Sequence, residues 1–176
     1  MPDSVLREHG IKEGTGYSSG GVIYLSEHIS DEEALEVVNH ELVHTMKQAD
    51  FGPYLQFTQT VERRLQQNQK TETVLSNLMN HRGVHGTYND LDLDQKFTVL
   101  DELNAGLYGG YQRYPEFTIE NMRSIMPDPE GYLAELDGIL AQYQQSRQAV
   151  TERDAASAPV QEPAADDAPE KMQGSR

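Results

Sequence analysis

The chain has 176 residues, of which 36% are hydrophobic, and it carries a formal net charge of -15 at pH 7. A charge of this sign and size argues against nucleic acid and anionic membranes as partners. The chain has no cysteine, which excludes disulfides and thiolate metal ligands. No apolar run is long enough to span a membrane, so we expect no membrane insertion. A chain of this length can form one domain with its own core.

The first thirty residues predict one strand. Residues 1–16 are polar with scattered apolar positions, and we expect a short helix or an arm there. Glycines then surround a turn, and Val22-Ile23-Tyr24-Leu25 follows, a β-branched and aromatic run that is typical of a strand. This strand serves the core alone, or it also presents a free edge to which a peptide adds through backbone hydrogen bonds. In the second case Tyr24 is a candidate contact for a peptide substrate.

A long helix is predicted next. Ser30-Asp31-Glu32-Glu33 has the pattern of a capping box, and acidic residues fill the first turn, where the helix dipole favours them. Asp50-Phe51-Gly52-Pro53 predicts the end of the helix, with glycine as the cap and proline preventing continuation. An apolar stripe at helical spacing is predicted to face the core. Its members are Leu35, Val38, Leu42, Met46 and Ala49.

The same helix carries His40-Glu41-Leu42-Val43-His44, an HExxH motif. Histidines four residues apart share one helix face, so both imidazoles can bind one metal ion. Glu41 can reach a water on that metal and take its proton. At about 100° per residue the histidines lie almost opposite the apolar stripe, which predicts a core face and a cleft face. The alternative is a solvated helix with two incidental histidines.

Residues 92–112 predict a second informative helix, with a stripe formed by Phe97, Leu100, Leu103, Leu107 and Tyr111. Glu102 lies off this stripe, and its neighbours on the same face are small, among them Ala105, Gly106 and Gly109. Small side chains let a helix backbone approach whatever the carboxylate binds, which offsets the cost of glycine in a helix, about 1 kcal/mol each. Glu102 is therefore predicted as a metal ligand, with a surface glutamate as the alternative.

The remaining segments are mostly helical by pattern. Residues 54–69, 71–80, 118–126 and 129–148 predict helices, and residues 81–90 predict a glycine-containing loop. His81, His85 and Tyr88 in that loop could contact substrate or supply a ligand; a surface loop with incidental histidines is the alternative. From about residue 150 the chain is rich in alanine, proline and acidic residues. We therefore expect a domain over residues 1–149 and a disordered acidic tail over 150–176.

Together these residues predict a catalytic zinc site. Three protein ligands and one water form the arrangement that catalytic zinc requires, and His40, His44 and Glu102 supply that count. Glu41 would act as the general base and not as a ligand. Candidates for stabilising the oxyanion, and thus for contacting the substrate, are His85, Tyr88 and Tyr108.

An HExxH motif followed by Glu-x-x-Ala resembles the zincin metallopeptidases, in particular the glutamate-ligand, gluzincin-like branch. His40, Glu41 and His44 match the first motif, Glu102 and Ala105 resemble the second, and the likeness spans residues 22–112. It implies one Zn²⁺ per chain, a cleft beside a strand edge, and hydrolysis of peptide bonds. It also implies an α+β, mostly helical fold, with a small sheet packed on the HExxH helix and a helical C-terminal part.

The sequence departs from other zincin branches. Lys47 stands near the position where metzincins have glycine, and no third histidine follows. Gly86-Thr87-Tyr88-Asn89-Asp90 resembles the aspartate-ligand zincins, but Asn89 stands where their acid is needed. If Asp90 were the ligand instead, Glu102 would be structural.

Three functions are compatible with these patterns. The first is a zinc endopeptidase acting on a protein or peptide substrate. The second is a catalytically silent zincin-fold domain that binds metal or regulates through protein interaction, and the third is a helical interaction module without metal. The retained Glu41 favours the first, because a structural site needs no base. The N-terminus lacks the apolar region of a signal peptide, and the small size resembles bacterial effector domains. A cytoplasmic protein and a delivered effector domain both fit this sequence.

Overall fold

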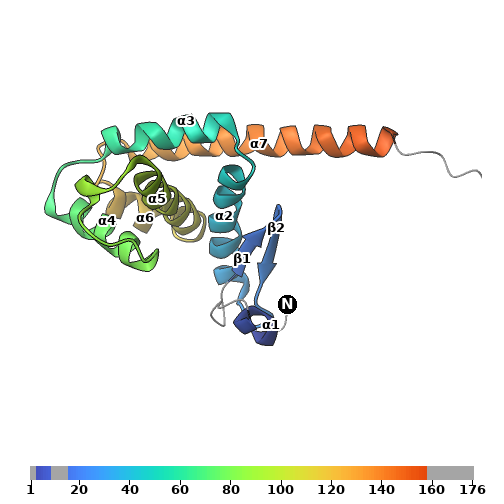
Figure 1. The fold of residues 1–176 in the computed structure, drawn as a ribbon, viewed down its shortest axis with the longest axis horizontal. Coiled ribbons are helices and arrows are strands. Elements are labelled where there is room, and N and C mark those ends of the chain that lie inside the picture. The colour runs from blue at the N-terminus through green and yellow to red at the C-terminus, as the bar shows by residue number, and fades with distance from the viewer. Residues whose placement is uncertain (1–2, 9–15, 158–176) are drawn as a thin grey trace, which may run out of the picture.

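The computed structural model describes residues 3–8 and 16–157. It is mostly helical, with one two-stranded antiparallel sheet, which confirms the predicted α+β, mostly helical class (Figure 1). The elements are α1 (Asp3–Glu8), β1 (Gly16–Ser19), β2 (Val22–Leu25), α2 (Asp31–Gln48), α3 (Gly52–Val61), η1 (Glu62–Arg64), α4 (Gln69–His81), η2 (Tyr88–Asp90), α5 (Leu93–Arg113), α6 (Pro115–Met122) and α7 (Pro129–Ser157). No helix in this described part combines the length and apolar character needed to cross a membrane.

The sheet is a hairpin, of which the sequence predicted only β2. Gly20 and Gly21 have φ values of 58° and 78°, which a tight primed turn requires and glycine allows. The strands pair with Tyr17 opposite Tyr24, and the two rings stack with centroids 4.9 Å apart. A Cβ at Gly16 would lie 2.6 Å from the Tyr24 carbonyl oxygen, so this position needs glycine. The strand β1 escaped prediction because it has no β-branched residue.

Helix α2 begins as its sequence predicts. Ser30 accepts a hydrogen bond from the Glu33 backbone, and the Glu33 side chain accepts one from the Ser30 backbone. The predicted end of this helix is wrong, because glycine is not its cap. Asp50, with φ 49°, takes the left-handed conformation after the helix, and Gly52 instead begins α3. Aspartate tolerates this conformation because its short polar side chain can hydrogen-bond locally.

The core is built around α5, which packs along α2 and also contacts α3, α4 and α6. From Val99 to Ala105 every α5 side chain is buried, so this helix is covered on nearly all sides instead of along one stripe. Gly109 lies where α5 crosses α2: a Cβ there would be 2.7 Å from the Glu36 carbonyl oxygen. This confirms the close helix approach predicted for the glycine-containing face. Gly106, by contrast, is exposed and has no neighbour within 4 Å of a Cβ position.

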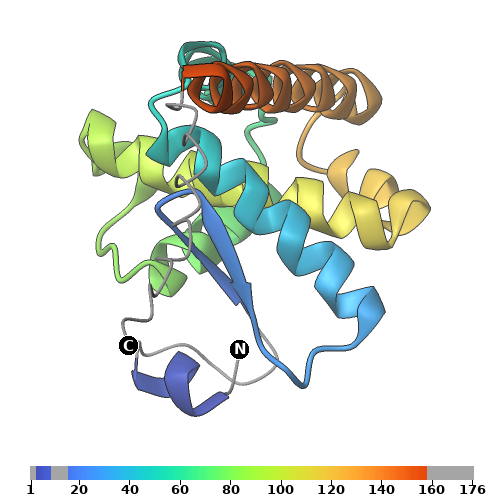
Figure 2. The ribbon, with the colours of Figure 1, turned by 90° about the vertical axis from the view of Figure 1, so that its right-hand side faces the viewer.

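The predicted apolar stripe of α2 is only partly buried. Met46 is fully buried, but Leu35 is 47% exposed and Ala49 is exposed. The buried side chains of α2 instead run consecutively from Val43 to Met46. The reason is that α2 lies between α5 and the hairpin, so its histidine face enters a helix interface and its N-terminal half lies at the edge of the body (Figure 2).

The remaining predicted helices are present, with shifted limits. Helix α7 runs along the body beside α3 and then projects beyond it (Figure 1). Its helical conformation continues to Ser157, past position 150 where we expected disorder to begin. The rest of the predicted tail, residues 158–176, lies outside the described residues.

Candidate metal site

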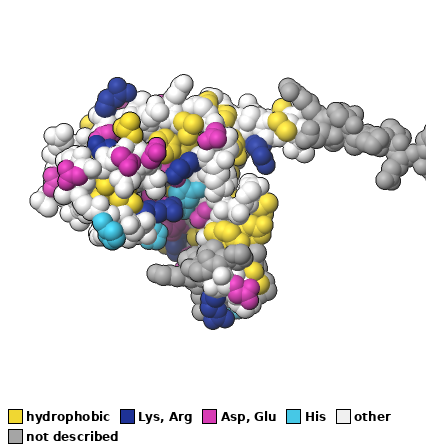
Figure 3. Space-filling view, viewed as in Figure 1, with side chains coloured by type: hydrophobic (Ala, Val, Ile, Leu, Met, Phe, Trp, Pro, Cys, Tyr) yellow, Lys and Arg dark blue, Asp and Glu magenta, His cyan; other side chains and the backbone are white. Residues whose placement is uncertain are grey.

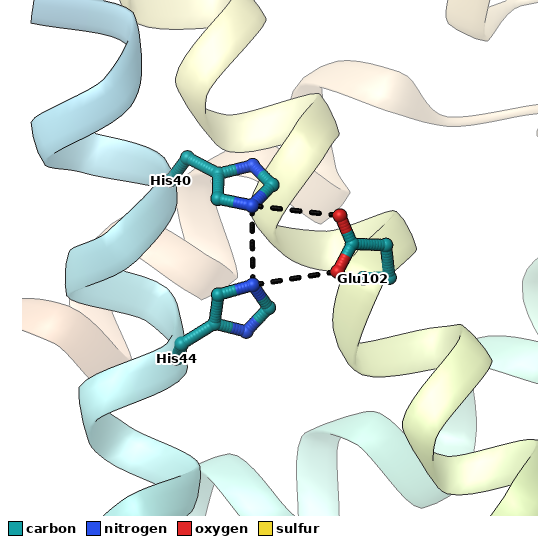
Figure 4. Close-up of side chains that lie close together, drawn as sticks. All are labelled: His40, His44 and Glu102. Carbon is teal, nitrogen blue, oxygen red and sulfur yellow. Dashed lines mark hydrogen bonds and ion pairs between the residues drawn. The ribbon is translucent and has the colours of Figure 1, made fainter. Parts of the chain in front are cut away.

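The structure brings together the three predicted ligands. His40 and His44 project from α2, and Glu102 faces them from α5 (Figure 4). The Nε2 atoms of the histidines are 3.1 Å apart. The Glu102 carboxylate places Oε1 3.5 Å from His40 Nε2, and Oε2 3.5 Å from His44 Nε2. Among the described residues this is a cluster whose donor atoms all lie within 4.8 Å of one another.

These separations fit a zinc ion. Tetrahedral zinc with bonds of about 2.0–2.1 Å places its ligand atoms roughly 3.4 Å apart. The two imidazole nitrogens, 3.1 Å apart, are close to that spacing, and each of them faces a different oxygen of Glu102 at 3.5 Å. Two imidazoles and one carboxylate are also the ligand types of catalytic zinc sites, which leave a fourth position for water or substrate.

Asp101, next to Glu102 on α5, orients one of the ligands. The His44 Nδ1–H donates to Asp101 Oδ2 at 2.8 Å, which points Nε2 at the cluster. Metal-binding histidines commonly make this contact with a carboxylate, which fixes the ring and its tautomer. Asp101 is itself buried, at 2% exposure, and lies 3.6 Å from the Lys47 ammonium. No motif in the sequence singles out this residue.

A buried chain of hydrogen bonds holds Asp101 in turn. The Tyr54 hydroxyl, on α3, donates to Asp101 Oδ1 at 2.6 Å. Asn104 donates to the Tyr54 oxygen at 3.2 Å and accepts a hydrogen bond from the Tyr132 hydroxyl of α7. Each of these polar groups has a partner, as burial in a core requires. The site is therefore anchored through α3 and α7 as well as by its own two helices.

Burial and neighbouring charges shift the pKa values of the cluster. Burial lowers the pKa of His44, but hydrogen bonds with Asp101 and Glu102 outweigh it and raise the value to about 9. Burial and the adjacent His44 lower the pKa of His40 to about 4. Burial raises the pKa of Glu102, but His44, His40 and Arg82 outweigh it and lower the value to about 2. A metal ion that binds here at neutral pH must therefore displace a proton from His44.

Glu41 is a half-buried carboxylate beside the cluster and is not one of its three donors. Burial raises the pKa of Glu41 above its usual value, against the lowering effects of His44 and of hydrogen bonds with Ser18 on β1. Ser18 is also held by Gln48 of α2, whose amide donates to its hydroxyl at 2.9 Å. A carboxylate with a raised pKa takes up a proton more readily than an ordinary one, as a general base requires.

The cluster opens into a cavity of about 910 Å³, which we call the α2–α5 cleft. It is lined by Gly16, Tyr17, Ser18, Glu36, Val37, His40, Glu41, His44, Lys47, Gln48, Asp50, His81, Arg82, Thr98, Asp101 and Glu102. In the space-filling view, histidine, basic and acidic side chains gather in the hollow between the helical body and the hairpin (Figure 3). The strand that lines the cleft is β1 and not Val22–Leu25, for which an edge role was one of two alternatives.

Two side chains from the end of α4 reach the cluster. Arg82, the residue that caps this helix, donates through Nη2 to Glu102 Oε2, and the same Nη2 lies 3.1 Å from His44 Nε2. The Nε2 of His81 is 4.0 Å from Glu102 Oε1, although its side chain is 71% exposed. His81 was one of the loop residues predicted to contact substrate or metal, while Arg82 was missed. No sequence pattern ties an arginine twenty residues upstream to Glu102.

The four other predicted contact residues do not line the cleft. Tyr24 stacks on Tyr17 in the hairpin, on the strand farther from the cluster. The Tyr108 hydroxyl donates to Asp137 of α7 at 2.7 Å, a contact within the helical body. Both were singled out for chemistry, but their helix and strand positions give them packing contacts instead.

The two predicted substrate contacts in the 81–90 loop also lie outside the α2–α5 cleft. His85 is exposed, and Tyr88 packs against the core, with Lys96 5.2 Å from the centre of its ring. The alternative ligand Asp90 accepts a hydrogen bond from the Thr87 hydroxyl at 2.6 Å and is not part of the donor cluster. The acid that faces the Nε2 atoms of both histidines is therefore Glu102 and not Asp90.

No protein-family model, no curated protein and no solved structure matches this chain. The side chains of the site itself define what chemistry it can perform. They provide two imidazoles and a carboxylate within bonding range of one ion, a second carboxylate with a raised pKa, and cations at the rim. Such a set of side chains can hold a divalent metal and accept a proton beside it.

Proposed function

We propose that this protein is a zinc-dependent metallopeptidase of zincin-like type, with His40, His44 and Glu102 as zinc ligands and Glu41 as general base. The observation that carries the proposal is the convergence of two imidazoles and a carboxylate from two helices, with one ligand atom from each residue within 4.8 Å of the others. The contact from Asp101 to His44 adds support, because a histidine held in this way presents Nε2 as a ligand.

Each residue of the site has its own role in the proposed hydrolysis. Zinc in such a site polarises a carbonyl group and lowers the pKa of water. Glu41 accepts the proton from the attacking water and then delivers it to the leaving amine as the peptide bond breaks. His40 and His44 stay fixed on one face of α2, and Asp101 prevents rotation of the His44 ring. The α2–α5 cleft, with β1 along one side, is where an extended peptide would lie.

The test compares the wild-type protein with Glu41→Gln, both loaded with zinc. Peptide termini generated in a complex protein mixture are identified by mass spectrometry, and zinc content is measured after dialysis. We expect new termini from the wild type only, with about one zinc per chain in both proteins. Removal of a general base typically costs roughly 100- to 10,000-fold in rate. Equal cleavage by the two proteins would refute the assignment of Glu41. Zinc binding without cleavage by either protein would leave a silent metal-binding domain.

A further inference from the structure

Arg82 occupies a position that the proposed function does not explain. Its Nη2 donates to Glu102 Oε2 and lies 3.1 Å from His44 Nε2. Both of these atoms belong to the donor cluster. Arginine keeps its positive charge at all relevant pH values and has no acceptor atom, so it cannot itself become a ligand. A guanidinium group in this place fills part of the space between the donors.

A metal ion and this guanidinium group cannot share the donors. A divalent ion bound to His44 Nε2 and Glu102 Oε2 would lie about 2 Å from each atom, inside the space that Arg82 Nη2 takes up. Two cations at such a distance also repel strongly in a half-buried site. We propose that Arg82 is an internal cation that competes with the metal for Glu102 and for the space beside His44, and that it therefore limits the metal affinity. This inference rests on the proposed metal site.

The burial of Glu102 explains why a cationic side chain pairs with it. The Glu102 side chain is only 6% exposed, and a buried carboxylate without a partner is strongly destabilising. Arg82 is the arginine that pairs with it among the described residues, and together with His44 it supplies the compensating charge. A bound metal would supply that charge instead. Exchange of Arg82 for a metal ion would therefore replace one counter-ion of Glu102 by another and keep the carboxylate paired.

Arg82 has room to leave. Its side chain is 37% exposed, and Glu102 is its one carboxylate partner among the described residues. It sits at the end of α4, and Gly83 and Gly86 follow with φ values of 65° and 112°. These glycines have no neighbour within 4 Å of a Cβ position, so the chain around them is open. The guanidinium group can therefore move toward the solvent side of the cleft at little cost in packing.

The first experiment measures the Zn²⁺ dissociation constant at pH 7 by competition with a chromophoric chelator. The variants are Arg82→Gln and, as a matched control, Arg63→Gln, which removes the same charge from an exposed position away from the cleft. We expect Arg82→Gln to bind zinc roughly 10- to 100-fold more tightly than the wild type, as loss of a charge-assisted hydrogen bond from the competing state implies. The control should differ by less than about twofold.

The second experiment uses the wild-type chain, so it does not depend on the folding of a variant. Phenylglyoxal modifies arginine side chains, and peptide mass spectrometry gives the rate at Arg82 and at Arg63. Saturating zinc should speed the modification of Arg82 severalfold and leave Arg63 unchanged.

The outcomes separate the two proposals. If wild type and Arg82→Gln bind zinc equally tightly, or if zinc protects Arg82 from phenylglyoxal, the proposed competition by Arg82 is refuted. The proposed metal site is not affected by either result. Absence of zinc binding in both proteins overturns the metal site, and this inference with it.

Discussion

At the residue scale, the hydrogen bond between His44 and Asp101 decides which ring nitrogen of His44 faces the cleft. The motif alone places two imidazoles on one helix face, but each ring can still rotate. The contact from Nδ1 to a buried carboxylate removes that freedom, and Tyr54 in turn holds the carboxylate. The orientation of the ligand thus depends on a residue of α5 and a residue of α3.

Replacing this carboxylate should weaken metal binding. Asp101→Asn keeps the size of the side chain but removes the charge that favours the required tautomer of His44. We expect the zinc dissociation constant to rise roughly 10- to 100-fold. Calorimetric or chelator-competition titration measures it. Asp94→Asn, an exposed change of the same charge on the same helix, is the control and should have little effect. An unchanged affinity in Asp101→Asn would show that His44 needs no such support.

The shifted pKa values predict how stability depends on pH when zinc is removed by a chelator. The pKa of His44 is raised to about 9, so its contribution is complete below pH 6.5 and is lost as the pH rises through 9. The pKa of His40 is lowered to about 4, so stability falls as the pH drops from 6.5 toward 4. The pKa of Glu102 is lowered to about 2, so its contribution is lost as the pH falls from 4.5 through 2.

The melting temperature of the chelated protein should therefore be highest near pH 6.5. In a His44→Gln variant the decline between pH 6.5 and 9 should shrink; an identical decline would contradict this account.

At the element scale, the site depends on how closely α2 and α5 approach. Gly109 is the point of contact, where a Cβ would meet the Glu36 carbonyl oxygen at 2.7 Å and His40 Cβ at 3.2 Å. A larger residue would push the helices apart at the level of a proposed ligand. The separation between the histidines and Glu102 is therefore set in part by a residue that binds nothing.

Two alanine substitutions on α5 test this contact. Gly109→Ala should lower the free energy of unfolding by about 1–2 kcal/mol, because the clash with backbone outweighs the gain in helix propensity. Gly106→Ala, at an exposed position with open space, should instead raise it by up to about 1 kcal/mol. Urea unfolding of both variants gives the comparison. Stabilisation by Gly109→Ala would mean that the helices are not in contact there.

At the scale of the whole molecule, α7 combines a packed half with a projecting half. Its last buried side chain among the described residues is Tyr143, whose ring lies 5.3 Å from that of Phe51 and whose hydroxyl donates to the Thr45 carbonyl oxygen at 3.3 Å. From residue 144 to 152 the helix is exposed. The domain core therefore ends near Tyr143.

Deletion of residues 151–176 should leave the melting temperature within about 2 °C of the wild-type value, because the composition of this segment predicts no packed structure. Tyr143→Ala should lower the free energy of unfolding by roughly 3 kcal/mol, because it removes a buried aromatic ring from the core. Thermal unfolding followed by circular dichroism measures the first change, and urea unfolding measures the second. A large fall on truncation would place a stabilising contact beyond residue 150.

Much of the fold was predictable because its signals are local. Capping at Ser30, the apolar spacing of α5 and the prolines around α6 and α7 act within a few residues, so the helices followed from the sequence. The strand β1 did not follow from the sequence, because its pairing with β2 and its packing on α2 make it a strand. The buried face of α2 was also misjudged, since its position between α5 and the hairpin decides which side is covered.

For the site, the sequence by itself determined that two imidazoles share one helix face and that Glu41 lies between this face and the apolar one, because spacing along a helix is a local property. It also singled out Glu102, through the small residues on the same face. Only the tertiary structure decided that Glu102 and not Asp90 meets the histidines, that Asp101 orients His44, and that Arg82 reaches the donors. These contacts join side chains from separate helices, and their distances follow from how the helices pack, which no short stretch of sequence specifies.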